Sequence, residues 1–357
     1  MKFKENALYS LVVPTSMGVR LTPHDRQPVH LARDYRLQAT SAESNVLSIA
    51  ASLGMRTKVL TTFVKDSPIA KFIKNDLMFR NIEFEGIEVE QGGPWGYRHQ
   101  FNIADSGYGL RGPRVHNDRS GEVGKTLNTK DFNLTKLFLE DGVKLIHISG
   151  LIASLSENSA KFCVELAKKA KTSGTKVSFD LNYRASFWKN RRDELENVFK
   201  SIAEVSDILI GNEEDFQLAL NIPGPEAGGK NISDEIDSFK TLINNAKAIY
   251  PNTKCFATTL REVNNANEHL WGAVALIDEE WQVVLPRPIQ VLDRIGGGDG
   301  FVGGFLYSLL KGFDSTSCLQ FAWACGAYVV TLLDDYGLVA DEEQIWSIYQ
   351  GNARVKR

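Results

Sequence analysis

The sequence predicts an α/β fold in which a mostly parallel central sheet is covered by helices on both faces. From about residue 140 onward, short apolar segments alternate with amphipathic helical patterns, which is typical of parallel strands joined by helices. The first third differs, because residues 8–40 and 86–125 are rich in Gly, Tyr and Arg and alternate polar with apolar residues. We therefore expect a small additional β-sheet from this part of the chain.

The individual elements follow from hydrophobic periodicity and from turn residues. In the first third, the short apolar run within residues 1–13 reads as a first strand, 17–21 and 115–122 as antiparallel strands, and 58–64 as a further strand. Residues 41–53 read as a helix that stops at Gly54, and 67–80 as a helix with Pro68 at its first position. The later strands are predicted at 144–149, 176–180, 207–211, 255–259 and 272–277. The later helices are predicted at 157–172, 192–203, 213–220, 234–248, 298–311, 315–333 and 341–350, with a Gly- and Pro-rich loop at 222–233.

Composition and charge exclude several classes of protein. The 357 residues are 43% apolar and 24% charged with a net charge of −3, which gives no electrostatic reason to expect nucleic acid or an anionic membrane as a partner. No apolar run approaches the length of a transmembrane helix, and the N-terminal segment lacks a signal-peptide cleavage pattern. The four cysteines form no Cys-x-x-Cys pair and read as buried free thiols, so we expect a reducing, cytoplasmic location.

The most informative stretch is residues 293–304, which read DRIGGGDGFVGG. Three glycines, Gly296 to Gly298, precede an amphipathic helix, so several N–H groups and the positive end of the helix dipole converge on one point that suits an anion. Asp299 stands at the edge of this point, where a carboxylate could take a proton from a hydroxyl that attacks a phosphate. The alternative is a plain turn capped by an aspartate. The position between a strand and a long helix, and the glycines within that helix, favour the anion site.

Polar residues follow several predicted strands at the point where each strand ends. Ser149 and Gly150 follow the first, residues 180–184 the second, residues 212–215 the third, and residues 258–261 the fourth. Ligands of open parallel sheets bind at the carboxyl ends of the strands. We therefore expect these side chains and Asp299 to converge on one crevice.

These residues resemble the ribokinase-like (PfkB) carbohydrate kinases, and among them the 2-keto-3-deoxygluconate kinases, over essentially the whole chain. The family signature Asp-Thr-x-Gly-Ala-Gly-Asp-x-Phe-x-x-Gly is matched from Asp293 to Gly304, with Arg294 in place of threonine and Gly297 in place of alanine. The resemblance implies a three-layer α/β/α domain with a small β-sheet lid. It assigns Asp299 as the catalytic base and the amides of Gly296, Gly297 and Gly298 as an anion hole.

The same resemblance implies a sugar-acid site. The stretch Asp180 to Arg184, followed by Phe187-Trp188, is similar to one in which an arginine holds the substrate carboxylate, and residues 111–120 resemble a lid segment that puts Arg119 beside the substrate. A surface salt bridge is the alternative for Arg184. The substrate loop Gly-Gly-x-x-x-Asn reads Thr40 to Asn45, so Asn45 is retained while both glycines are lost. A looser backbone approach to the sugar or an added Ser41 hydroxyl contact would result.

A nucleotide and metal site is implied by two further motifs. The family motif Asn-x-x-Glu reads Asn212 to Asp215, which implies that Asn212 helps to position phosphate and that Asp215 and Glu214 act indirectly on Mg²⁺. Thr259 and Arg261 fall where the family contacts nucleotide phosphates, together with Gly296 and Gly298. The implied cofactors are ATP and Mg²⁺.

The resulting expectation is an ATP-dependent kinase that phosphorylates 2-keto-3-deoxy-D-gluconate at its 6-hydroxyl. Residues 1–357 are expected to form one kinase domain whose lid, built from about 16–38 and 88–124, closes over the sugar, and the lid sheets are expected to pair in a dimer or larger homo-oligomer. The pKa of Asp299 need not be raised, because the helix terminus favours the charged form. Three alternatives remain open: a kinase for a neutral sugar such as fructose or ribose, a nicotinamide-dependent dehydrogenase, and a sugar-binding protein that has lost catalysis.

Overall fold

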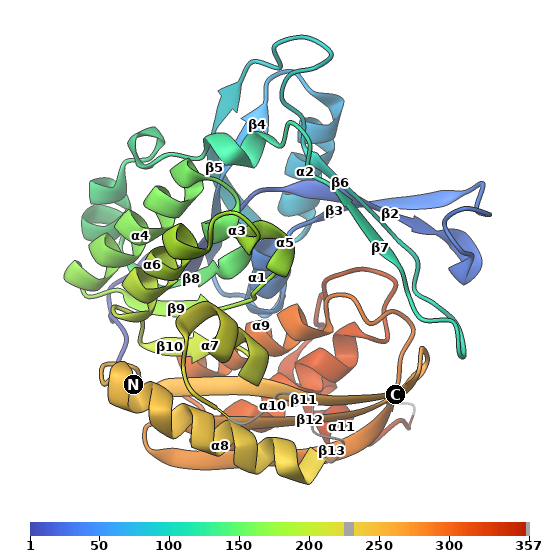
Figure 1. Cartoon of the computed structure of the whole chain (residues 1–357), viewed down its shortest axis with the longest axis vertical. Helices are drawn as coiled ribbons and strands as arrows, with labels where there is room; N and C mark the ends of the chain where they lie inside the picture. The colour runs from blue at the N-terminus through green and yellow to red at the C-terminus, as the bar shows by residue number, and fades with distance from the viewer. Residues whose placement is uncertain (225–231, 355–357) are drawn as a thin grey trace.

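The computed structural model describes residues 1–224 and 232–354, which form two sheets and the helices around them (Figure 1). Part of the predicted loop at 222–233 therefore lies outside the described residues. The main sheet has the spatial order β13 (Glu280–Gln290), β12 (Glu268–Ile277), β11 (Cys255–Asn265), β10 (Ile208–Ile210), β9 (Lys176–Asp180), β8 (Val143–Ser149), β1 (Tyr9–Pro14), β4 (Thr57–Val64) and β5 (Ile82–Val89). The second sheet, which we call the lid sheet, has the order β3 (Tyr35–Thr40), β2 (Gly18–Pro23), β6 (Gln100–Ala104) and β7 (Val115–Asp118).

The helices agree closely with the predicted ranges. They are α1 (Ala42–Ser52), α2 (Pro68–Phe79), α3 (Gly150–Ser154), α4 (Glu157–Thr172), α5 (Ala185–Trp188), α6 (Arg192–Ala203), α7 (Glu213–Leu220), α8 (Ile232–Ile249), α9 (Gly297–Lys311), α10 (Ser315–Val329) and α11 (Glu342–Tyr349). Short 3₁₀ turns occur at His24–Arg26, Val123–Thr126 and Thr129–Asp131, and a π-helical turn at Lys136–Asp141. Pro68 stands at the start of α2 as expected.

Two hydrophobic cores lie on opposite faces of the main sheet. Alternate residues of a strand point to opposite faces, and in β1 the side chains of Leu11 and Val13 join one core while Val12 joins the other. The first core also contains residues of α1, α2, α9, α10 and α11, and the second contains residues of α3, α4, α6, α7 and α8. This arrangement confirms the predicted α/β fold with a mostly parallel sheet and a small lid sheet, which extends away from the main sheet in Figure 1.

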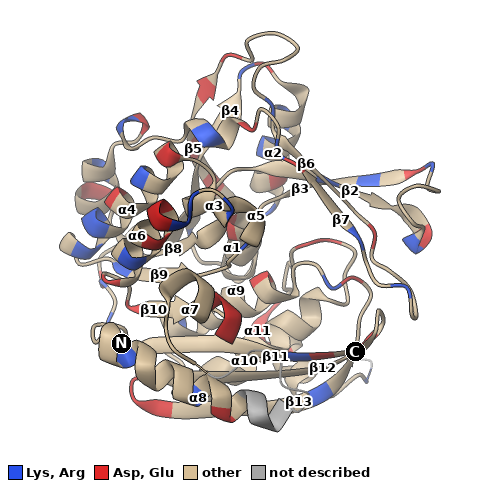
Figure 2. Cartoon of the chain, viewed as in Figure 1, with Lys and Arg blue, Asp and Glu red and all other residues tan. Residues whose placement is uncertain are grey.

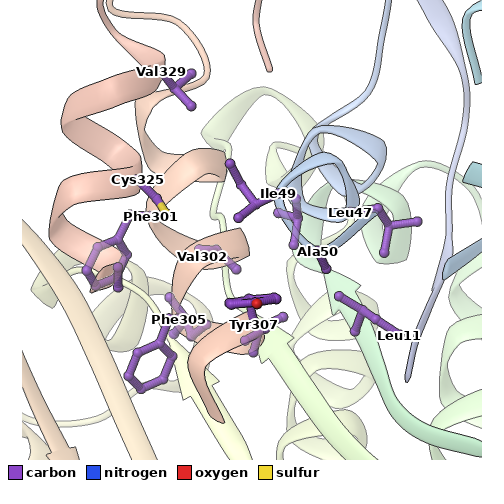
Figure 3. Packing of buried hydrophobic residues seen from close by; sticks show 14 of the residues in the cluster. Leu11, Leu47, Ile49, Ala50, Phe301, Val302, Phe305, Tyr307, Cys325 and Val329 are labelled. Atoms are coloured by element: carbon purple, nitrogen blue, oxygen red, sulfur yellow. The ribbon is translucent and has the colours of Figure 1, made fainter. Parts of the chain in front are cut away.

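Close packing of α9 explains the glycines inside it. A Cβ atom on Gly303 would lie 2.6 Å from the carbonyl oxygen of Val46 in α1, and one on Gly304 would lie 2.7 Å from the Cβ of Cys325 in α10. Figure 3 shows α9 between these two helices, with Phe301 and Val302 among the buried side chains. The glycines therefore let α9 approach both neighbours, and this packing fixes where the helix begins.

Several features of the sheets differ from the prediction, which contained no strand at β3, β5 or β6. Strand β12 runs antiparallel to β11, and β11 continues to Asn265, so Thr259 and Arg261 lie within this strand rather than after it. Strands β2 and β6 of the lid sheet are parallel neighbours. No strand was predicted at β13, whose two prolines, Pro286 and Pro288, obscure the strand pattern; an edge strand tolerates them because its outer N–H groups need no partner.

The surface and the cysteines match the expectations from composition. Figure 2 shows acidic and basic residues interspersed over the elements rather than gathered by sign. Within residues 1–224 and 232–354, no helix is long and apolar enough to cross a membrane. The four cysteines are buried and free, and burial raises the pKa of the Cys163 thiol well above its usual range.

Candidate active site

Asp299 lies in the first turn of α9 and is held by a residue from α1. The side-chain amide of Asn45 donates a hydrogen bond to Oδ2 of Asp299 at 2.9 Å. Burial raises the pKa of Asp299 well above its usual range; the Asn45 hydrogen bond opposes this shift, and the carboxylates of Asp180, Asp335 and Glu43 add to it. The expectation that the helix terminus leaves this pKa unraised is therefore wrong, because desolvation and like charges outweigh the dipole.

Backbone conformation and close packing explain some, but not all, of the three glycines before Asp299. Gly296 is the N-cap of α9 with φ of 86°, and a Cβ there would lie 1.9 Å from the carbonyl oxygen of Asp335, so only glycine fits. The N–H of Gly297 points to the carbonyl oxygen of Arg294 at 3.4 Å. A Cβ on Gly298 would meet no atom within 4 Å, so packing does not explain this glycine. Its N–H lies in the first turn, where helix geometry leaves N–H groups without intrahelical partners.

Gly298 borders a hollow of about 220 Å³ whose charged side chains are Arg261 and Glu213. The hollow is also lined by Asn212, Glu213, Phe239, Thr258, Thr259, Leu260, Arg261 and Trp271. Desolvation by the surrounding protein lowers the pKa of Arg261 to about 10, with a further contribution from the positive charge of Arg294. Desolvation and these two arginines lower the pKa of His269 to about 4. Cations that disfavour one another in this way would be stabilised by an anion.

Arg294 is a candidate site residue that the sequence did not assign. It was visible only as the residue that replaces threonine in the signature, and its electrostatic effect on Arg261 and His269 depends on the fold. No carboxylate oxygen lies within 4 Å of the charged nitrogens of Arg261 or Arg294 in the part of the chain that the structure describes. No carboxylate of the described residues therefore neutralises either positive charge through an ion pair.

Two arginines from different elements lie near carboxyl groups that influence Asp299: Arg184 near Asp180, and Arg119 near Glu43. Arg184 at the start of α5 is exposed, and its guanidinium donates to the carbonyl of Tyr183 at 2.7 Å. Arg119 follows β7 and is paired with the buried carboxylate of Glu122 through contacts of 2.8 and 3.0 Å. The Cζ of Arg119 lies 5.6 Å from the ring centroid of Phe187, so the lid segment contacts α5 close to Arg184. The structure thus brings the two predicted arginines together but leaves Arg184 less engaged than Arg119.

Several buried carboxyl groups accompany these arginines. Asp180, at the end of β9, has a pKa raised to about 7, chiefly by burial and also by the charge of Asp215. Burial likewise raises the pKa of Glu43, which accepts hydrogen bonds from Thr15 at 2.7 Å and from Ser149. Sequence reasoning missed Glu43 and Glu122, because their importance comes from partners that are distant in the chain.

The hydroxyl groups of Ser16 and of the two residues that replace the family glycines are used within the protein. Ser16 donates to Glu122 at 2.6 Å, and Thr40 donates to Asp335 at 2.8 Å. Ser41 accepts the N–H of Ser44 as the N-cap of α1 and donates to the sulfur of Met17 at 3.3 Å. Ser41 also borders a small hollow with Glu43 and Arg119. Its first role is therefore to cap the helix that carries Asn45.

The motif from Asn212 to Asp215 forms a helix cap. The side chain of Asn212 accepts the N–H of Asp215 at 2.8 Å, and the two carboxylate oxygens of Asp215 accept the N–H groups of Asn212 at 2.9 Å and Tyr183 at 3.0 Å. Within residues 1–224 and 232–354, no group of three or more His, Cys, Asp or Glu side chains could hold a metal ion. The structure therefore gives Asp215 a capping role that joins α7 to the end of β9, and its action on Mg²⁺, like that of Glu214, stays a prediction.

Comparison with known proteins identifies the family. Residues 15–336 match the pfkB family of carbohydrate kinases. The chain is 25% identical to a 2-dehydro-3-deoxygalactonokinase of Haloferax volcanii over 95% of this chain and 96% of that protein, and 24% identical to a 5-dehydro-2-deoxygluconokinase of Clostridium tetani over 92% and 89%. It superposes on the crystal structure of a 2-dehydro-3-deoxygluconokinase from Thermotoga maritima with a TM-score of 0.86 and 25% identity, covering 96% of this chain and 100% of that one.

The match spans Asp299, the glycines before it, the charged hollow and both arginines. The match argues against a nicotinamide-dependent dehydrogenase, because the glycine-rich turn belongs to a kinase signature rather than to a dinucleotide-binding motif. The chain therefore belongs to the pfkB family of carbohydrate kinases.

Proposed function

We propose that this protein transfers the γ-phosphoryl group of ATP to the 6-hydroxyl of 2-keto-3-deoxy-D-gluconate. The observation that carries the proposal is that Asp299 directly follows Gly298, which borders the hollow with Arg261, and lies near Asp180, whose pKa the charge of Arg184 also influences. An anion site, a base and a guanidinium that has no carboxylate partner among the described residues fit a nucleotide phosphate, a hydroxyl and a carboxylate. A related sugar acid is the second candidate, because the relatives named above act on three different ones.

Asp299 acts as the base in this proposal. The 6-hydroxyl oxygen attacks the γ-phosphorus, and the bond between the γ-phosphorus and the β–γ bridging oxygen breaks. The hydroxyl proton passes to a carboxylate oxygen of Asp299. ADP leaves with the bridging oxygen. The raised pKa suits this task, since a base is most effective when its pKa lies near the working pH. Asn45 keeps Oδ2 of Asp299 oriented while the other oxygen takes the proton.

The charged hollow stabilises the transferred group. The N–H of Gly298 and the guanidinium of Arg261 are placed to meet charge on the phosphoryl oxygens. Mg²⁺ would arrive with ATP, take phosphate oxygens and water as most of its ligands and neutralise part of their charge, with Glu213 the carboxylate that lines the hollow. The lid sheet would exclude water, which could otherwise accept the phosphoryl group.

A homo-oligomer formed through the lid remains part of the proposal. Leu37 in β3 and Val115 in β7 are exposed at 37% and 53%, and Leu110 in the connection between β6 and β7 at 98%. The pairing register puts Leu37 and Val115 on opposite faces of the lid sheet, so a second copy that covers the face of Leu37 would not also cover Val115.

Gly298→Ala should separate stability from function. A methyl group has free space there, so we expect the free energy of unfolding to rise by about 0.4–1 kcal/mol. The same methyl group would occupy the space beside the amide that the phosphate needs, so kcat/KM for ATP should fall at least about tenfold. Steady-state kinetics and urea unfolding measure both effects.

Gly312→Ala, at the other end of α9, is the matched control. Gly312 has φ of 81° and open space around it, so this variant should lose stability and keep normal kinetics. An unchanged kcat/KM in Gly298→Ala would remove Gly298 from the phosphate site.

Asp180→Asn should shift the acidic limb of the pH profile. Because the pKa of Asp299 is raised, kcat/KM should fall about tenfold for each pH unit below it. The charge of Asp180 contributes to that raised pKa, so removing it makes ionisation of Asp299 easier and moves the limb to lower pH. The profile of kcat/KM for the sugar acid tests this. Asp207→Asn, at the opposite end of the parallel strands, is the control. A limb that stays in place or moves to higher pH would contradict the assignment.

Arg184→Ala should impair sugar acids selectively. Loss of a charge-assisted contact of about 1.5–3 kcal/mol predicts a fall of roughly 10- to 100-fold in kcat/KM for a sugar acid. For a neutral sugar that is a poor substrate, kcat/KM should fall less than about threefold. Arg192→Ala, an exposed arginine at the start of α6, is the control. Equal losses on both substrate types would mean that Arg184 does not hold a carboxylate.

A further inference from the structure

Three buried charged side chains connect the lid sheet to the glycine turn that precedes α9. Arg20 in β2 is 1% exposed, and Asp293 and Asp335 are 0% and 3% exposed. The Nη2 of Arg20 donates to Oδ2 of Asp293 at 2.6 Å, and its Nη1 donates to Oδ1 of Asp335. We call this group the lid clamp, because its members are 273 and 315 residues apart in sequence and join two parts of the fold.

The two aspartates of the lid clamp are held by further contacts from both sides. Asp293 accepts the hydroxyl of Ser106 at 2.7 Å and the N–H of Ile295 at 3.0 Å. Asp335 accepts the hydroxyl of Thr40, at the end of β3, at 2.8 Å. Arg20, Thr40 and Ser106 come from the lid sheet or its connections, whereas Ile295 belongs to the glycine turn.

The lid clamp also forms the wall against which the glycine turn rests. The carbonyl oxygen of Asp335 packs so closely on Gly296 that no side chain fits there. The hydrogen bond from Ile295 to Asp293 fixes the turn one residue before Gly296. The positions of Gly298 and Asp299 therefore follow from the positions of both aspartates.

Stability alone does not account for such a group. Buried ion pairs seldom stabilise a fold more than apolar side chains of the same volume, since desolvation offsets their attraction. Here one guanidinium faces two carboxylates. Burial lowers the pKa of Arg20, but Asp335 and Asp293 outweigh this and raise it, so the guanidinium stays charged. What the charged contacts provide beyond an apolar cluster is a defined geometry between β2 and the glycine turn.

We propose that Arg20, Asp293 and Asp335 are positioning residues through which the lid sheet holds the glycine turn in the geometry that phosphoryl transfer needs. The inference rests on the proposed function of that turn. It implies that the base of the lid and the phosphate site respond together. A sugar acid that orders the lid sheet should then also slow hydrogen exchange at the amides of residues 295–300 before ATP binds.

The test uses Asp335→Asn, Arg20→Lys and Arg20→Met in the full-length protein. Asp207→Asn is the matched control, because Asp207 is also a buried carboxylate with ion-pair partners but lies directly before β10, at the opposite end of the parallel strands from Asp180. The measurements are the melting temperature, kcat and KM, and hydrogen exchange of the peptide that covers residues 293–301, with and without 2-keto-3-deoxygluconate.

Displacement of reacting groups by a fraction of an ångström predicts that kcat falls about 10- to 100-fold in Asp335→Asn and Arg20→Met. The KM for the sugar should change less than about threefold. Arg20→Lys should recover part of the loss. Amides 295–300 should exchange faster than in the wild type, and protection by the sugar acid should disappear. Asp207→Asn should lower the melting temperature while kcat and exchange near residue 295 stay normal.

Wild-type kcat and wild-type exchange in Asp335→Asn would overturn the inference, even if the melting temperature falls. Should Arg20→Met fail to fold, Asp335→Asn and Arg20→Lys carry the test. A wild-type protein that phosphorylates no sugar or sugar acid would overturn the proposed function instead. In that case the exchange rates at 295–300 still decide whether the lid clamp holds the turn.

Discussion

Asp299→Asn is expected to lower kcat by about 10²- to 10⁴-fold with little change in KM for ATP. The reason is that a positioned general base contributes rate enhancements of that size, and asparagine cannot accept the proton. Asparagine can still accept the hydrogen bond from Asn45, so the local geometry should survive. A coupled assay of ADP formation with a saturating sugar acid measures the effect. Turnover within about tenfold of the wild type would contradict the assignment of the base.

The same substitution should make the protein more stable at neutral pH. The pKa of Asp299 is raised in the folded state, so between its unfolded and folded values the folded protein binds more protons and stability falls as pH rises. Above the folded pKa the full penalty is present, and asparagine removes it. Asp314→Asn, at the N-cap of α10, is the control, because hydrogen bonds with Ser317 lower the pKa of Asp314 and its charged form is favoured. At pH 7–8 the melting temperature should therefore rise for Asp299→Asn and should not rise for Asp314→Asn.

Gly296→Ala is expected to cause the largest loss of stability. A left-handed conformation costs a non-glycine residue about 1–2 kcal/mol, and a Cβ 1.9 Å from the carbonyl oxygen of Asp335 adds about 1–3 kcal/mol of overpacking. The free energy of unfolding should fall by about 2–5 kcal/mol. Because relief of the clash must shift the turn, kcat should also fall at least about tenfold.

Gly312→Ala again provides the comparison, since it carries the conformational cost without the clash. Urea unfolding and steady-state kinetics of the two variants isolate the contribution of the close contact. If Gly296→Ala lost no more stability than Gly312→Ala and kept normal kcat, the wall formed by Asp335 would not fix the turn.

The parts of the fold that the sequence predicted are those with local signals. Helix α9 was predicted because its apolar residues follow the helical period, and Asp299 was found because it stands beside three glycines. Strand β13 was not predicted because Pro286 and Pro288 interrupt the pattern of an edge strand. The position of Arg261 inside β11 was missed because the segment after Thr259 is polar, although it continues the pairing with β12.

The parts of the site that the sequence could not predict depend on contacts between distant segments. Arg119 was expected beside the substrate, but its pairing with Glu122 depends on how the lid segment turns after β7. Ser41 was considered as a substrate contact, yet its hydroxyl caps α1. The raised pKa of Asp299 reflects burial and three carboxylates from separate elements. None of these effects has a counterpart in motif spacing.

The most direct test is to incubate the wild-type protein and Asp299→Asn with MgATP and 2-keto-3-deoxy-D-gluconate and to identify the product by ³¹P NMR. Parallel reactions use the galactonate-derived acid, fructose and ribose. The proposal predicts that the wild type forms ADP and the 6-phosphate ester of the sugar acid in equal amounts, and forms them faster than any product from the neutral sugars, while Asp299→Asn forms almost none. Faster phosphorylation of fructose or ribose, or no ester from any sugar acid, would contradict it.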